Sequence, residues 1–349
     1  MEFDRWCLSS YLGLRYVAGE SRAWCDGVEP VRPRVEAGAQ TAVSTAGEIV
    51  SALRLEIARS CAGKSVGLLL SGGIDSAILA ALLPEDTPAY TIRFEAPGTV
   101  DESVEAARYA RHCGHSHRVV SVTWADCLAH MDALMAHKRS PLHPVEVGLF
   151  LAASTAAEDG VTHLVVGNGA DSTFGGLDKL LSIDWSFDDF IRRYTFVEPS
   201  DALRTPISLR SVYEPYRTGE GIDVVGFLKN VHGLGIIQAF DNAISAAGCS
   251  SVEPYETLAL GAPLDIARIR RGESKYLLRE VFLGLYPGFA LPPKIAFARP
   301  LDAWLADWPG PRRPEFLPGL DLSRFRGEQR FLLMCLERFL DLIERGALP

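Results

Sequence analysis

The first half of the chain alternates short apolar runs with longer amphipathic stretches. The apolar runs have the length of buried strands, and the stretches between them have helical periodicity. Strands that alternate with helices form parallel sheets covered by helices on both faces. The pattern therefore predicts an α/β fold with a doubly wound parallel sheet, with strands at 66–70, 89–94, 117–122 and 162–166 and helices at 44–61, 77–83, 101–113, 124–136 and 145–158.

The strand pattern fades after Gly176, and the C-terminal half is expected to be mostly helical. Helical periodicity recurs there at 187–194, 222–231, 234–247, 275–285 and 327–346, and more weakly near the start at 6–16. The last of these stretches is amphipathic. Packing onto the body of the protein is its expected role, and a partner interface is the alternative.

Composition and charge narrow the class of protein. The 349 residues are 48% hydrophobic with a net charge of −9, which is typical of a globular protein and unlike an enzyme with a basic nucleic-acid-binding face. No run of apolar residues reaches membrane-spanning length. The seven cysteines are scattered without a CxxC pair, so we expect reduced thiols, no zinc site and a cytoplasmic location.

The most informative segment is Ser71-Gly72-Gly73-Ile74-Asp75-Ser76, which lies between a strand and a helix. The first turn of a helix has unpaired N–H groups at the positive end of its dipole, and glycines let an anion approach them closely. The two serines add hydroxyl donors, which favours phosphate binding. Asp75 would repel phosphate unless it holds a bridging divalent cation. The alternative is a plain serine-glycine turn with an aspartate at the helix start.

A second glycine-rich loop, 167–176, follows the fourth strand and contains Asp171. Ligands of doubly wound sheets bind beyond the carboxyl ends of the strands, where both loops are expected. Asp75 and Asp171 could there share one Mg²⁺, with ATP phosphates and water as its other ligands. The alternative is that Asp171 only caps the next helix.

The SGGxDS loop resembles that of the PP-loop ATP pyrophosphatase superfamily, whose members cleave ATP between the α and β phosphates. The full set of motifs resembles the synthetase domain of the asparagine synthetase family, which includes β-lactam synthetase, carbapenam synthetase and lasso-peptide cyclase. Order and rough spacing agree over about 230 residues. The matching segments are 71–76, Asp101-Glu102-Ser103, 167–176, Pro254-Tyr255, Lys275-Tyr276-Leu277-Leu278-Arg279 and Pro293-Lys294.

The resemblance implies roles for individual residues. ATP would be bound by Leu69 and Ile92 beside adenine, Gly167 beside the nucleoside, and Ser71, Gly72, Gly73 and Ser76 around the phosphates, with Asp75 and Asp171 holding Mg²⁺. Lys294 would be catalytic, offsetting negative charge at the α-phosphate and the reacting carbonyl. Lys275 would contact pyrophosphate, although an exposed helix lysine is the alternative.

The chain departs from the family on the side of the amine. The family has Glu or Tyr at the position of Asn168, and an asparagine side chain cannot act as a general base. Glu253 or Glu256, beside Pro254-Tyr255, could supply that base, or each could simply form a salt bridge. Plain asparagine synthesis is therefore disfavoured.

The resemblance also extends upstream. Residues 11–19 and 27–30 resemble the connector that follows the family's glutaminase domain, and position two is Glu2 rather than the cysteine nucleophile. We therefore expect residues 1–43 to be a connector remnant, residues 44–349 to be the synthetase domain, and the ammonia-generating chemistry to be missing.

The expected function is an ATP-dependent, AMP- and pyrophosphate-forming amide synthetase of specialised metabolism. It would adenylate a small-molecule or peptide carboxylate and couple it to an amine or free ammonia, without nucleic acid or membrane. A homodimer or a partner protein is left open. The alternatives are a PP-loop tRNA-modifying enzyme and an inactive partner subunit related to asparagine synthetase.

Overall fold

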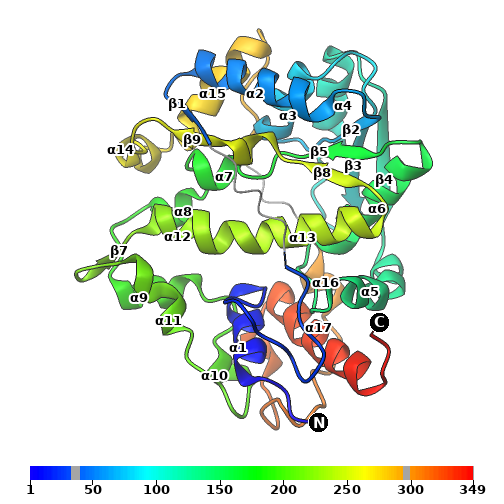
Figure 1. Cartoon of the computed structure of the whole chain (residues 1–349), viewed down its shortest axis with the longest axis vertical. Helices are drawn as coiled ribbons and strands as arrows, with labels where there is room; N and C mark the ends of the chain where they lie inside the picture. Colours follow the sequence, from blue (N-terminus) through cyan, green and yellow to red (C-terminus); the bar gives the residue numbers. More distant parts are fainter. Residues whose placement is uncertain (33–39, 294–298, 349) are drawn as a thin grey trace.

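A five-stranded parallel sheet forms the centre of the upper part of the molecule (Figure 1). The computed structural model describes residues 1–32, 40–293 and 299–348. The strand order in the sheet is β4-β3-β2-β5-β8, so β2 is central. The strands are β2 (Val66–Leu69), β3 (Ala89–Phe94), β4 (His117–Val122), β5 (His163–Val165) and β8 (Ser250–Val252).

Helices cover both faces of this sheet, as a doubly wound fold requires. On one face α2, α3, α4 and α15 share a core with the sheet, and on the other α6 and α13 pack against it. Their apolar stripes account for these positions, since each helix buries one face against the strands. The helices are α2 (Ala46–Cys61), α3 (Ile74–Leu82), α4 (Ser103–His112), α6 (Glu146–Glu158), α13 (Gly233–Ala246) and α15 (Tyr276–Leu285).

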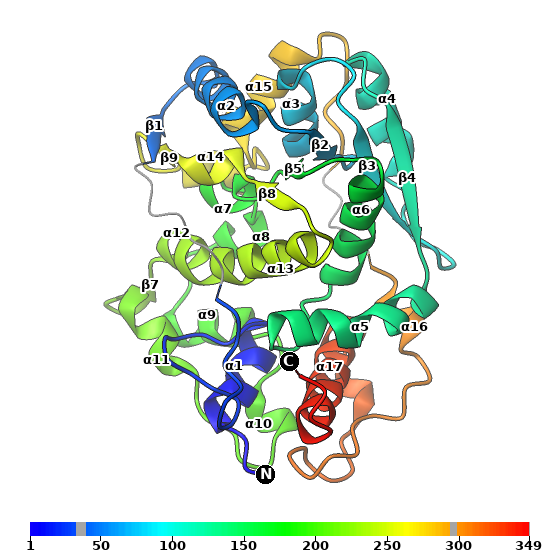
Figure 2. The same ribbon diagram turned by 45° about the vertical axis from the view of Figure 1, so that its right-hand side comes forward.

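A second, mostly helical layer lies on the other side of α13 (Figures 1 and 2). Here α1 (Arg5–Leu14), α5 (Trp124–Lys138) and α17 (Gly327–Glu344) share the largest apolar core, in which Trp24 contacts Phe339 with ring centroids 5.0 Å apart. The C-terminal amphipathic helix therefore packs onto the body, as expected. Residues assigned to the connector also contribute, since α1 belongs to this core and β1 (Thr41–Val43) pairs in parallel with β9 (Leu258–Leu260).

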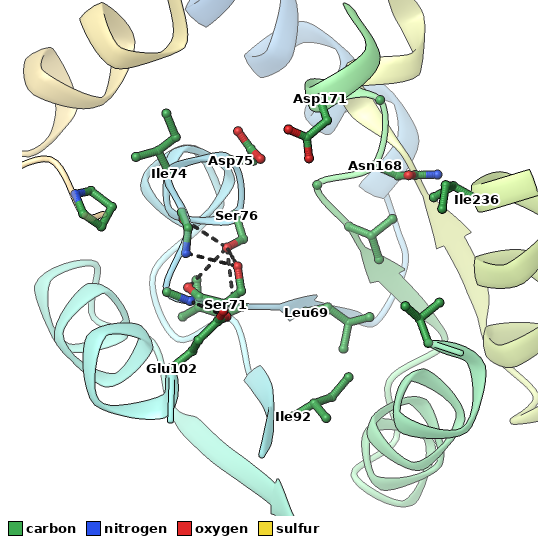
Figure 3. Close-up of a pocket in the computed structure, with 18 of the residues that line it drawn as sticks. Leu69, Ser71, Ile74, Asp75, Ser76, Ile92, Glu102, Asn168, Asp171 and Ile236 are labelled. Atoms are coloured by element: carbon green, nitrogen blue, oxygen red, sulfur yellow. Dashed lines mark hydrogen bonds between the residues drawn. The ribbon is translucent and has the colours of Figure 1, made fainter. Parts of the chain in front are cut away.

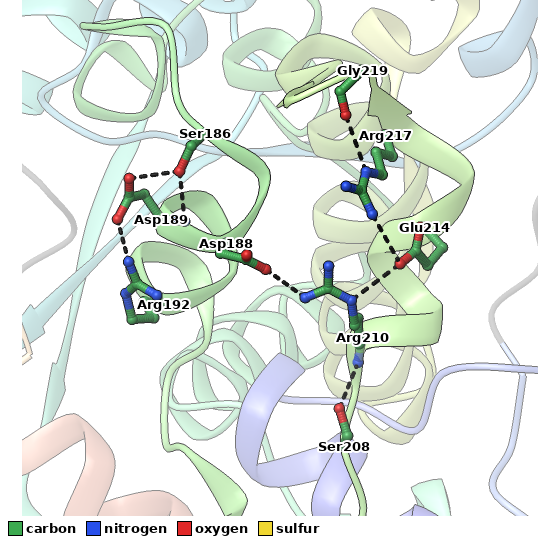
Figure 4. A network of polar contacts seen from close by, with 9 residues as sticks. All are labelled: Ser186, Asp188, Asp189, Arg192, Ser208, Arg210, Glu214, Arg217 and Gly219. Atoms are coloured by element: carbon green, nitrogen blue, oxygen red, sulfur yellow. Dashed lines mark hydrogen bonds and ion pairs between the residues drawn. The ribbon is translucent and has the colours of Figure 1, made fainter.

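Beside that core, α9 (Phe187–Tyr194) and α11 (Arg210–Tyr213) are joined by surface ion pairs (Figure 4). The guanidinium of Arg210 contacts the carboxylates of Asp188 and Glu214 and lies 4.7 Å from the centre of the Phe187 ring. Because these groups are exposed, the ion pairs contribute little to stability. The aromatic cluster beneath them, which includes Phe190 and Phe227, holds the two helices together.

The predicted fold class is confirmed, and the strand at 117–122 and the helix at 187–194 have the predicted bounds. Two predictions need correction. The strand pattern does not end near Gly176, because β8 extends the main sheet and β9 pairs with β1. The single helix expected at 222–231 is instead β7 (Gly221–Ile222), α12 (Val224–Phe227) and a π-helical turn at Leu228–His232. The other short elements are α7 (Ala170–Thr173), α8 (Asp178–Leu181), α10 (Pro199–Ala202), α14 (Ile266–Arg270), α16 (Leu301–Trp304) and β6 (Arg217–Thr218).

Candidate active site

A cavity of about 750 Å³ lies at the carboxyl ends of β2, β3 and β5, where the doubly wound topology predicts a ligand site. Both glycine-rich loops line it, and helix α13 forms the opposite wall through Gly233, Ile236 and Phe240 (Figure 3). The first turn of α15 and residues 290–293 also border it. The site thus combines segments from most of the length of the chain.

The first loop is folded around its two serines. Ser76 Oγ accepts a hydrogen bond from the Ser71 N–H at 3.0 Å and lies 3.0 Å from Ser71 Oγ, which itself accepts from the Gly73 N–H (Figure 3). Gly73 is the N-cap of α3 and has no side chain to cap it, and the first residues of that helix line the cavity. These features fit a phosphate cradle better than a capped turn, because in this helix Asp75 lies within the first turn and is not the cap.

An acidic side chain already contacts this loop. Glu102 Oε2 accepts a hydrogen bond from the Gly72 N–H at 3.4 Å, and burial raises the pKa of the Glu102 carboxyl. A carboxylate oxygen in this position shows that the loop N–H is available to an anion. Glu102 belongs to the Asp101-Glu102-Ser103 segment, which resembles a family motif but implied no role for this residue.

Asp75 and Asp171 converge as the sequence predicted, and Lys275 lies between them. The Lys275 ammonium is 2.5 Å from Asp75 Oδ2 and 2.8 Å from Asp171 Oδ1. Burial opposes the charged form of Lys275, but the two carboxylates outweigh it and raise its pKa above the ordinary value. Lys275 therefore stays protonated, and the reading of an exposed helix lysine is wrong because only 9% of its side chain is exposed.

Glycine is required at two points of the second loop. Gly169 has φ +87°, a conformation that favours glycine, and an added Cβ would lie 2.9 Å from Glu256 Oε1. An added Cβ on Gly176 would lie 1.8 Å from Asp171 Oδ1 and 2.3 Å from Lys275 Cε. The absence of side chains at these two glycines therefore leaves room for the Asp75–Lys275–Asp171 cluster.

The two aspartates fit a Mg²⁺ ion. Their oxygens converge on one point charge, the lysine nitrogen, and Mg²⁺ is commonly held by one or two carboxylates with substrate phosphates and water. The described part of the chain contains no group of three or more His, Cys, Asp or Glu side chains placed to bind a metal. A metal at this site would complete its ligand set with phosphate oxygens or water.

The wall next to the loops is apolar. Leu69 and Ile92, the expected neighbours of adenine, pack with Val145, Leu149 and Phe240 and line the same cavity (Figure 3). Gly167 lies beside the phosphate loop, since its added Cβ would be 3.3 Å from Asp75 Cβ. The structure thus brings together an apolar surface of suitable chemistry for a purine and a loop for its phosphates.

Asn168 is positioned by one of the two candidate bases. Its Nδ2 donates to Glu253 Oε2 at 3.4 Å, and burial together with nearby Asp241 and Glu256 raises the pKa of Glu253 to about 8. Glu256 lines the cavity, whereas Glu253 lies behind Asn168. Burial also raises the pKa of Glu256, with Lys229 opposing the shift. Neither described glutamate forms an ion pair shorter than 4 Å, so the salt-bridge alternative is not what the structure shows.

Sequence reasoning singled out Lys275 but missed other basic side chains of the cavity. Arg15, His143, His232 and Arg299 all line it. Arg15 lies within the segment that resembles the connector, but a single arginine in an apolar stretch has no motif to mark it. Lys294, the predicted catalytic residue, lies outside the described residues; its neighbours Pro293 and Arg299 border the cavity.

Comparison with known proteins identifies the region that carries the two loops. The family model described as asparagine synthase matches residues 51–218. A search of curated proteins found no match. Among the described helices, none is long and apolar enough to span a bilayer.

Two solved structures show weak overall similarity. NMN synthetase from Francisella tularensis is 18% identical with a TM-score of 0.29, over 38% of this chain and 59% of its own. The U34-tRNA thiolase NcsA from Methanococcus maripaludis, solved with its [4Fe-4S] cluster, is 13% identical with a TM-score of 0.28, over 71% of this chain and 82% of its own.

Proposed function

We propose that this protein is an ATP-dependent, AMP- and pyrophosphate-forming amide synthetase, because residues 51–218 match the model of the asparagine synthase family, an ATP-using family of carbon–nitrogen ligases. It adenylates a carboxylate and couples the acyl group to an amine or ammonia. The observation that supports this most is the convergence of Asp75 and Asp171 beside the serine-glycine loop in one cavity.

The nucleotide half of the reaction follows from the charges of the site. The N–H groups at the start of α3 and the hydroxyls of Ser71 and Ser76 bind phosphate oxygens. Asp75 and Asp171 would hold Mg²⁺, which neutralises the leaving pyrophosphate when it is bound. Lys275 is the second cation there, and its ammonium offsets phosphate charge as the α–β bond breaks.

The carboxylate needs this activation because it has no good leaving group of its own. Its oxygen attacks the α-phosphorus, pyrophosphate leaves, and the amine then displaces AMP from the acyl carbon. A neutral amine is required for that attack. Glu256 is the better placed of the two candidate bases, because it lines the cavity and burial raises its carboxyl pKa toward neutrality.

The departure at Asn168 supports an acid and amine other than those of asparagine synthesis. Asn168 is held by Glu253 and can orient a substrate by hydrogen bonds without taking a proton. We place the protein in specialised metabolism on this ground, with small-molecule or peptide substrates.

The test is a product analysis with the full chain. The protein is incubated with ATP, Mg²⁺ and a panel of carboxylic acids with and without amines, and the products are followed by phosphorus NMR. AMP and pyrophosphate are expected from at least one acid and should disappear in Asp75→Asn. Formation of ADP and phosphate instead would contradict an acyl-adenylate mechanism.

A matched control keeps the result interpretable. Asp178→Asn changes an aspartate just beyond the second glycine-rich loop, on α8, that does not line the cavity. It should retain activity. Equal loss in both variants would show that Asp75 has no special role.

A further inference from the structure

Arg15 is a buried arginine at the end of α1 that faces the cavity. It is 8% exposed and is the C-cap of the helix, with φ 69° and ψ 12° in the left-handed region. That position normally favours glycine or asparagine, and a non-glycine residue there is uncommon. Non-glycine residues held in such backbone conformations cluster at active sites and ligand-binding sites.

Among the described residues, the guanidinium of Arg15 contacts uncharged groups: the Phe196 ring, His232 and the Tyr194 hydroxyl. It lies 3.6 Å from the centre of the Phe196 ring, and Nη2 is 3.5 Å from His232 Nδ1, which also contacts the Tyr194 hydroxyl at 3.0 Å. Arg15 Nε is buried without a hydrogen-bond partner. Within residues 1–32, 40–293 and 299–348, Arg15 forms no ion pair with a carboxylate.

His143 adds a second donor that lacks a partner in the same cavity. It is 2% exposed, and its Nδ1 accepts a hydrogen bond from the Val145 N–H at 3.3 Å. Burial, reinforced by Arg15 and Arg299, lowers the pKa of His143 well below its ordinary value, so the ring is neutral. With Nδ1 as acceptor, the proton must be on Nε2, and Nε2 is buried without a hydrogen-bond partner.

Arg15 brings a buried positive charge to this end of the cavity. Burial lowers the pKa of Arg15 to about 10, with Tyr194 and the Glu328 carboxylate opposing the shift, and this leaves it protonated at neutral pH. His232 is neutral because burial and Arg15 lower its pKa to about 3, with Asp171 opposing the shift. Arg299 lines the cavity as well and pairs with Glu328. A buried positive charge without an ion-pair partner is costly unless a ligand supplies the anion.

Arg15 and the phosphate loop border the same cavity from different elements. Arg15 follows α1, and α1 and α3 lie on opposite sides of α13 in both views (Figures 1 and 2). The ATP phosphates already have the donors of the loop and Lys275. The planar fork of an arginine suits a carboxylate in particular, with which it forms paired hydrogen bonds.

We propose that Arg15 and the Nε2–H of His143 bind a carboxylate that does not react, carried by one of the two substrates. The proposal rests on the amide-synthetase function proposed above and adds a substrate class to it. The carboxylate belongs either to the activated acid, which is then a dicarboxylic acid, or to the amine, which is then an amino acid.

The experiment compares paired substrates in two assays on the full chain. ATP–pyrophosphate exchange without amine is measured with straight-chain dicarboxylic acids and with their monomethyl esters. Amide formation is measured with α-amino acids and with their amides. Discrimination of about 30-fold or more in kcat/KM within one of these pairs is expected, as for a carboxylate held by a buried arginine.

Variants assign that discrimination to the subsite. Arg15→Gln should abolish it, Arg15→Lys should keep part of it, and His143→Phe should reduce it about fivefold. Arg22→Gln is the matched control: this arginine also stacks on an aromatic ring, Trp6 at 5.0 Å, but is outside the cavity and should leave discrimination unchanged. Arg15→Gln should fold with unchanged or higher melting temperature, since it removes an unpaired buried charge.

The outcomes separate this proposal from the function on which it rests. The proposed carboxylate subsite is overturned if neither assay discriminates: exchange is the same with diacids and esters, and amide formation is the same with amino acids and amides. The proposed synthetase function is unaffected by that result. Discrimination that survives in Arg15→Gln also overturns the subsite. If no acid supports exchange, the proposed function fails, and the carboxylate subsite is then tested by the melting temperature with diacids and with their esters. A larger shift with diacids that is lost in Arg15→Gln supports the subsite. Equal shifts in the wild type and in Arg15→Gln refute it.

Discussion

Glu253 is the residue whose replacement tests the electrostatics of the site most directly. Its carboxyl lies behind Asn168 with Oε1 buried and without a hydrogen-bond partner, and its pKa is raised to about 8 by burial and by Asp241 and Glu256. We predict that Glu253→Gln stabilises the protein at neutral and alkaline pH. The amide keeps the size of the side chain and an oxygen that accepts from Asn168, and it removes the charge.

The size of the effect follows from the two pKa values. Between about pH 4.5, the ordinary value, and a folded-state pKa of about 8, the folded chain holds a proton on Glu253 that the unfolded chain has lost. Stability therefore falls as the pH rises, by about 1.4 kcal/mol per pH unit in this window. At pH 7 the glutamate costs about 3 kcal/mol, and at pH 5 it costs less than about 1 kcal/mol.

Urea unfolding from pH 5 to pH 8.5 measures this difference. The variant should gain about 3 kcal/mol over the wild type at pH 7, and the gain should shrink toward pH 5. Glu158→Gln, on the exposed end of α6, is the matched control and should change stability by less than about 0.5 kcal/mol at every pH. A gain for Glu253→Gln that does not depend on pH would refute the assignment of a raised pKa to this carboxyl.

Four further changes test other parts of the site and the surface. Asp171→Asn should lower pyrophosphate release at saturating ATP by about 100-fold or more and raise the Mg²⁺ concentration needed for half-maximal rate, as measured by coupled pyrophosphate detection. Lys275→Met should lower the free energy of unfolding by about 1–3 kcal/mol in the absence of Mg²⁺. Calorimetry should show that Mg²⁺ raises the melting temperature of this variant more than that of the wild type. Equal increases would argue against a position between the two aspartates that either the lysine ammonium or Mg²⁺ can occupy. Lys294→Ala should abolish turnover while the Kd for ATP, measured by calorimetry, changes less than about threefold; a strong loss of ATP binding would make Lys294 a nucleotide ligand instead. Arg210→Ala should leave the midpoint of urea unfolding nearly unchanged, because its ion pairs are exposed.

The strands could be predicted where the apolar runs are long enough to be recognised as buried strands. Strands β2, β3 and β4 have four to six residues and are bounded by polar or glycine-rich turns. Strand β8 has only Ser250, Ser251 and Val252, which show no apolar alternation, and it becomes a strand because it pairs with β5. Strands β1 and β9 are equally short and depend on each other in the same way. Pairing between distant segments is tertiary information that a local pattern does not contain.

The nucleotide half of the site was more predictable than the substrate half. The loop at 71–76 and Asp171 follow strands directly, so their meeting follows from the parallel topology. Contact of Lys275 with pyrophosphate stays a prediction; its position between the two aspartates, at the left-handed N-cap of α15 with φ 54°, was not predicted. Arg15 lies about 60 residues before the first loop, and only folding of α1 against α17 and residues 142–143 brings it to the cavity.

The register of β2 on β5 has a consequence for how mutations can affect this protein. Leu68 pairs with Val165, and Asp75 and Asp171 follow these positions by seven and six residues. A hydrogen-bonded register changes only in steps of a whole residue, about 3.3 Å. Core substitutions that shift side chains by tenths of an ångström therefore leave the separation of the two carboxylates nearly unchanged. The distance between the two aspartates therefore changes in steps of one residue. Substitutions within the strands preserve this distance, whereas a single insertion or deletion between a strand and its loop disrupts it.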